Sequence, residues 1–188
     1  HGLRSLINRS TLALQGMALL AAGPLLVAPA AILPLFRVPA RPDLLAAWCW
    51  LAVSIQISMT SAPSGHHLNA TRHIERHALL SGLFLVIGVG AGILALVAWG
   101  VAGAGVMRFA IDAPLAWARM GLSNRWVRWI GVDGGRLVAG QLAMLVLLAA
   151  ALLALRWPVT VALWLAVVFW QLPIVIDLAR PSRSAAGP

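Results

Sequence analysis

The chain has 188 residues, of which 61% are hydrophobic and only 10% are charged, and its mean hydropathy is +0.91. A soluble domain carries about 25% charged residues, because its surface must meet water. This composition excludes a soluble globular domain. It predicts an all-α, polytopic transmembrane helix bundle that forms a single domain over residues 1–178.

The charge is strongly positive, with 14 basic against 5 acidic residues and a net charge of +9. Every basic residue is an arginine, and the arginines are dispersed between apolar runs. We therefore expect them in loops and at helix ends, where they face the anionic headgroups of a lipid bilayer. No nucleic-acid partner is expected; other membrane subunits are the alternative partners.

Five apolar runs approach the length of about 20 residues that a helix needs to cross the hydrocarbon core. The first run contains three prolines, Pro24, Pro29 and Pro34, so it should be kinked or broken. In the third run, Gly88 and Gly92 form a G-x-x-x-G motif, which we interpret as a close helix contact rather than a dimer signal. The expected spans are 12–35, 44–60, 78–100, 137–155 and 159–176.

The segment 101–136 is apolar but interrupted by arginines and aspartates. Burying these charges in the hydrocarbon core would be energetically unfavourable, so a transmembrane helix is not expected here. We expect amphipathic helix lying at the membrane interface, and a disordered tail over 179–188. With five spans, the arginines divide five against nine between the two sides, which predicts an external N-terminus and a cytoplasmic C-terminus. The arginine- and alanine-rich usage suggests a prokaryotic cytoplasmic membrane.

A polar stretch over residues 55–77 separates the second and third runs and holds four of the five histidines. His73 and His77 are spaced i, i+4, so a helix would place both imidazoles on one face, where they could be two ligands of one metal ion. A turn at Pro63-Ser64-Gly65 would separate His66 from that face. The simpler alternative is a solvated loop with histidines at the interface.

Asp133 precedes the fourth run, in the sequence Asp-Gly-Gly-Arg. An aspartate there can cap the helix; alternatively, it faces the bundle interior as a metal ligand. Three polar side chains inside the runs, those of Gln15, Gln56 and Gln141, are expected to pair across helices, as is Ser54.

Two short elements resemble integral-membrane zinc metalloproteases of the site-2 protease type and related zincin-like membrane proteins. Residues 22–26, Ala-Gly-Pro-Leu-Leu, resemble the Gly/Ala-Pro-Leu element of those proteases. Residues 51–64 resemble a segment of the zincin-like relatives in which a Pro-Ser turn precedes an aspartate, and His67 stands at that place here. Alternatively, Asp133 with its two glycines is similar to the Asp-Gly-Gly motif of the proteases. The resemblance implies zinc, with His67 or Asp133 as the third ligand.

The catalytic H-E-x-x-H motif of that family is absent from the sequence. Glu75 lies between His73 and His77 as H-x-E-x-H, which turns its carboxylate away from the face that the two histidines share. The candidate metal ligands are therefore His67, His73, His77 and Asp133, without a catalytic residue.

These features favour a non-catalytic membrane protein. One interpretation is an inactive relative of a site-2-protease-like enzyme, or a fragment of one truncated before His1, since the chain does not begin with methionine. A second is a scaffolding subunit of a membrane complex. A third is a small transporter or permease domain, because broken helices can line substrate sites.

Overall fold

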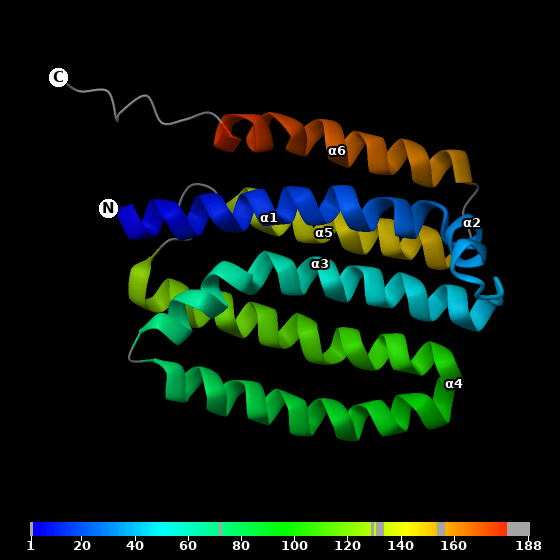
Figure 1. The fold of residues 1–188 in the computed structure, drawn as a ribbon, viewed down its shortest axis with the longest axis horizontal. Helices are drawn as coiled ribbons and strands as arrows, with labels where there is room; N and C mark the ends of the chain where they lie inside the picture. Colours follow the sequence, from blue (N-terminus) through cyan, green and yellow to red (C-terminus); the bar gives the residue numbers. More distant parts are fainter. Residues whose placement is uncertain (1, 72, 129, 131–133, 154–156, 180–188) are drawn as a thin grey trace.

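The computed structural model describes residues 2–71, 73–128, 130, 134–153 and 157–179. Within these ranges all regular structure is helical, so the predicted all-α bundle is confirmed, with its long helices side by side (Figure 1). Four of the helices, α1, α3, α4 and α5, are long and apolar enough to cross a membrane, and α6 carries a shorter apolar stretch, so the protein is membrane-embedded. The elements are α1 (Gly2–Val27), α2 (Pro29–Ile32), the 3-10 helix η1 (Leu33–Phe36), α3 (Pro42–Ala70), α4 (Ile74–Val127), α5 (Gly134–Leu152) and α6 (Trp157–Ala179).

The first predicted span is broken, as its prolines indicated. α1 ends at Val27, and Ala28 leaves helical geometry with φ −133° and ψ 49°. Pro29 then starts α2, where its missing N–H costs nothing. The span also begins earlier than expected, because α1 starts at Gly2 and not near residue 12.

α3 differs from the prediction at its C-terminal end. Pro63, Ser64 and Gly65 lie inside the helix, which continues to Ala70. The turn expected there is therefore wrong. A membrane helix tolerates an internal proline when its neighbours compensate for the lost hydrogen bond, and this one brings His66 and His67 onto the same helix as Ser58.

α4 is a hairpin of two arms rather than one straight helix. Gly100 has φ +56° and ψ −136°, a backbone conformation open to glycine alone. The first arm (74–99) and the second arm (101–127) fold back side by side (Figure 1). A Cβ on Gly88 would overlap Ile111 and one on Gly92 would overlap Met107, so the G-x-x-x-G motif serves packing inside the chain, as predicted.

The second arm corrects the expectation of an interfacial segment over 101–136. It lies along α3 and the first arm, inside the bundle (Figure 1). Gly103 allows it to approach the backbone of Ala95, and Gly105 allows it to approach the backbone of Ala47. Two of its charged side chains, Asp112 and Arg119, have polar partners on α3 and on the first arm. Residues 129 and 131–133 of the segment lie outside the described ranges.

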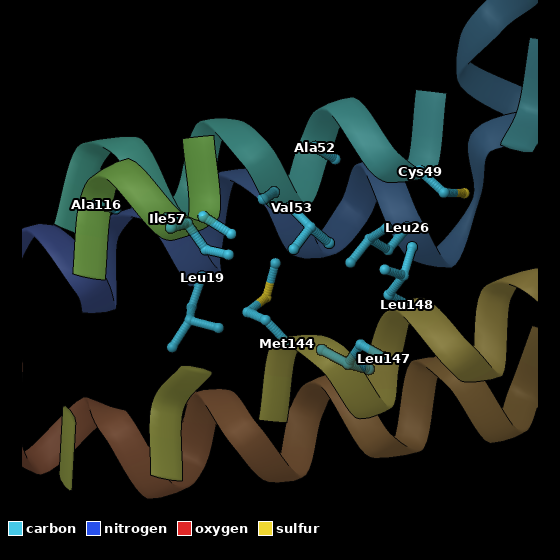
Figure 2. Close-up of a cluster of buried hydrophobic side chains, with 12 residues drawn as sticks. Leu19, Leu26, Cys49, Ala52, Val53, Ile57, Ala116, Met144, Leu147 and Leu148 are labelled. Atoms are coloured by element: carbon cyan, nitrogen blue, oxygen red, sulfur yellow. The ribbon is translucent and has the colours of Figure 1, made fainter. Parts of the chain in front are cut away.

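The apolar core is formed by α1, α3, the second arm and α5 (Figure 2). Val53 and Met144 at its centre are fully buried. The first arm is the outermost and carries the most exposed apolar side chains, such as Val97 at 83%, which suits contact with lipid. The labelled core side chains are Leu19, Leu26, Cys49, Ala52, Val53, Ile57, Ala116, Met144, Leu147 and Leu148.

Because α4 is a hairpin, the chain passes along the bundle six times. The start of α1 and the end of α6 consequently lie at the same end, which we call the terminal end (left in Figure 1). The break after α1 and the turn at Gly100 lie at the other end, which we call the Gly100 end (right in Figure 1). The first arm, α5 and α1 start at the terminal end, and α3, the second arm and α6 finish there.

A candidate polar column between α3 and the arms of α4

An ion pair lies on the second arm where it faces α3. Arg108 Nε donates to Asp112 Oδ2 at 2.7 Å, one helical turn apart. The Asp112 side chain is only 8% exposed, whereas that of Arg108 is 56% exposed. Ser58 of α3 also lies against the carboxylate. A buried carboxylate inside an apolar helix is costly without such partners.

Arg119 lies two turns further along the second arm and faces the same side. Its Nη2 donates to Ser81 Oγ on the first arm at 3.4 Å, and its Nε is buried without a hydrogen-bond partner. Its aliphatic part passes Gly65 of α3, where an added Cβ would lie 3.9 Å from the arginine Cδ. Arg119 also interacts electrostatically with Asp112. One arginine therefore links all three helices.

Two histidines continue the polar contacts towards the terminal end. His67 Nδ1 lies 3.1 Å from Ser123 Oγ, which joins α3 to the second arm. His77 Nδ1 lies 2.6 Å from Asn69 Oδ1, which joins the first arm to α3. His77 Nε2 is buried and has no hydrogen-bond partner.

Aromatic contacts bound this set of polar side chains at both ends. At the terminal end, the His73 ring stacks on Trp126 with centroids 4.1 Å apart, and the Arg76 guanidinium lies 5.5 Å from the same indole ring. Towards the Gly100 end, Trp50 packs on Phe109 with centroids 4.9 Å apart. We call the polar set between them the polar column: Ser58, His67, Asn69, His77, Ser81, Asp112, Arg119 and Ser123.

The three predicted metal ligands that the structure describes lie towards the terminal end but have separate partners. His67 contacts Ser123, His77 contacts Asn69, and His73 stacks on Trp126. Among the described residues, no three His, Cys, Asp or Glu side chains form a group that could hold a metal ion. Asp133 lies outside the described residues, so the zinc site stays a prediction.

The glutamines behave only in part as the sequence indicated. Gln15 of α1 donates from Nε2 to the carbonyl oxygen of Leu137 on α5 at 3.1 Å, a contact across helices. Gln56 instead contacts Thr60 within α3. Gln141 and Gln171 are buried, and neither amide has a hydrogen-bond partner for its nitrogen or its oxygen.

Sequence reasoning missed Asp112, Arg119 and Ser123, because it placed their segment at the interface. A signal for them was present. These residues are spaced seven and four apart, which puts them on one helical face. Ser54, Ser58 and Ser61 repeat at the same helical spacing on α3. Two matching polar faces in adjacent apolar helices predict a helix–helix contact rather than two surface helices.

No family model, no curated protein and no solved structure matches this chain. The resemblance to site-2-protease-like enzymes therefore has no support beyond the residues that suggested it. The chemistry of the polar column is the evidence that bears on function.

Proposed function

We propose that this protein is a small membrane transporter in which the polar column carries a proton and Asp112 takes it up and releases it. The observation that supports this most directly is the burial of Asp112 between α3 and the second arm. Ionisable side chains within membrane helices are rare, and they commonly mark ion or proton pathways.

Asp112 has the surroundings that such a group needs. Protonation of one carboxylate oxygen would cancel the charge that pairs with Arg108, and release of the proton would restore the pair. From Asp112 to Ser123 the second arm rises about 16 Å, roughly half of the 30 Å hydrocarbon core. Ser58, Arg119 and Ser123 supply polar atoms along this length, and the contact between Trp50 and Phe109 lies on the Gly100 side of Asp112.

The distribution of arginines supports an orientation with both termini in the cytoplasm. Cytoplasmic loops are enriched in basic residues, and of the eight described arginines outside the middle of the second arm, six lie near the terminal end and two near the Gly100 end. The proposed C-terminal side agrees with the expectation from the sequence, whereas the N-terminus changes sides because the α4 hairpin adds one pass. A prokaryotic cytoplasmic membrane also stays a proposal. The six are Arg4, Arg9, Arg76, Arg125, Arg128 and Arg136, and the two are Arg37 and Arg41; Arg108 and Arg119 lie within the second arm and are not counted.

The test is proton flux into liposomes containing the purified protein. A potassium gradient with valinomycin sets the membrane potential, and a pH-sensitive dye inside reports acidification. We expect Asp112→Asn to lower the flux at least tenfold, since an amide cannot bind and release the proton. Asp43→Asn is the matched control, because Asp43 also pairs with an arginine, Arg41 at 2.8 Å, but outside the polar column.

Equal loss of flux in both variants, or no difference between Asp112→Asn and the unmodified protein, would refute the proposal. Flux no greater than in empty liposomes would also refute it and would favour a scaffolding role. Protease activity is not part of this proposal, since the H-E-x-x-H motif that the resemblance would require is absent from the sequence.

A further inference from the structure

A groove of about 660 Å³ lies between α1 and α3 at the terminal end. Its α1 wall is formed by Leu3, Leu6, Ile7, Ser10 and Leu14. Leu3 and Leu6 are exposed and Ile7 is buried beneath them, so this face of α1 is only partly covered. Its α3 wall runs from Ala62 to Thr71. From Leu14 to Leu3 the groove spans about 16 Å, which is close to the depth of one leaflet of a bilayer with a 30 Å core.

The polar atoms of the groove are concentrated in two histidines. Ser10 and Thr71 also line it, but their hydroxyls are already bonded to backbone carbonyls of their own helices. His66 is exposed and makes no hydrogen bond within the described part of the chain. His67 uses Nδ1 towards Ser123 Oγ; when Nδ1 accepts from that hydroxyl, Nε2 carries the N–H and can donate to a ligand. A neutral imidazole always has one N–H to donate.

The charge around the groove is positive. Arg4 is exposed, directly follows Leu3 in sequence and lies one turn before Ile7. Arg9 is exposed one residue before Ser10. No carboxylate is among the described residues that line the groove. A long apolar wall, imidazole donors and arginines at the membrane surface together match a molecule with an acyl chain and an anionic head.

We propose that this groove binds one anionic phospholipid, with an acyl chain along the α1 face and the phosphate at His66, His67 and Arg4. The arginines attract the phosphate at the membrane surface. The acyl chain packs against the exposed side chains of Leu3 and Leu6. Inorganic phosphate alone would gain nothing from the apolar wall. This binding does not depend on proton transport.

The test is native mass spectrometry of the detergent-purified protein, titrated with phosphatidylglycerol or with phosphatidylcholine of the same acyl chains. We expect one saturable lipid adduct, with about tenfold tighter binding of phosphatidylglycerol. Inorganic phosphate at the same concentrations should give no adduct. Equal affinity for the two lipids, or binding of phosphate without a chain, would overturn the proposal.

Two variants locate the lipid. Ala62→Phe fills the groove and should weaken phosphatidylglycerol binding at least tenfold, and His66→Ala should reduce the preference over phosphatidylcholine. Ala104→Phe is the matched control, because Ala104 lines a different apolar pocket of about 250 Å³, near the Gly100 end. Equal effects of Ala62→Phe and Ala104→Phe would overturn the assignment. Protection of the buried Cys49 thiol from a maleimide dye shows that each variant is folded.

Discussion

Gly105 lies where the second arm of α4 meets the backbone of α3. A Cβ at this position would be 2.5 Å from the carbonyl oxygen of Ala47 and 2.9 Å from Trp50 Cβ. Carbon atoms pack at about 3.5–4.0 Å, so Gly105→Ala must push the two helix backbones apart by about 1 Å. Overpacking of this kind costs about 1–3 kcal/mol.

The same substitution also has a favourable part, because alanine stabilises a helix by about 1 kcal/mol relative to glycine. Gly105→Ala should therefore lower the free energy of unfolding by up to about 2 kcal/mol. Gly121→Ala on the same arm is the matched control. Nothing lies within 4 Å of an added Cβ there, so this variant should be as stable as the unmodified protein or up to about 1 kcal/mol more stable.

The single cysteine provides the assay. Cys49 is 3% exposed in the core, so its reaction with a maleimide dye reports unfolding in detergent as temperature or denaturant is raised. An interfacial second arm would have no contact with α3, and both glycine variants would then be neutral or stabilising. That result would refute the packing described above.

Two further substitutions test single features of the fold with the same cysteine assay. Gln141→Leu should raise the free energy of unfolding by about 1–3 kcal/mol, because it removes two buried polar atoms that have no hydrogen-bond partner. An unchanged free energy of unfolding would mean that these atoms have hydrogen-bond partners in the membrane. Gly100→Ala should lower the free energy of unfolding by about 1–3 kcal/mol, because alanine is strained at φ +56°. An unchanged free energy of unfolding would mean that α4 does not turn at this residue.

The sequence was sufficient for the fold class, because helix length and apolar content follow from local composition. It was also sufficient for the broken first span and for the packing role of Gly88 and Gly92. The α4 hairpin was not predicted, because the energetic cost of burying the charges of Asp112 and Arg119 argued against a second membrane-crossing helix. Their cost is reduced by Ser58 and Ser81, which are distant in sequence, so the pairing becomes visible only in the folded chain.

The histidines illustrate the same limit at the candidate site. The i, i+4 spacing of His73 and His77 favoured one helix that carries both on one face, but α4 begins at Ile74 with His73 as its N-cap residue, so only His77 lies within the helix. Spacing could not show that His73 would stack on Trp126 or that His77 would meet Asn69. Those partners come from the second arm and from α3. The turn expected at Pro63 failed because a proline in a membrane helix does not by itself end the helix.

The most direct test of the account is the sidedness of the two ends of the second arm. In a Cys49→Ala background, single cysteines replace Val101 or Arg125, and sealed vesicles of one orientation are treated with a membrane-impermeant maleimide. A second arm that crosses the membrane predicts that one position reacts from outside and the other only after the vesicles are permeabilised. Reaction of both positions from the same side would contradict the hairpin, and with it the burial of Asp112 on which the proposed transport depends.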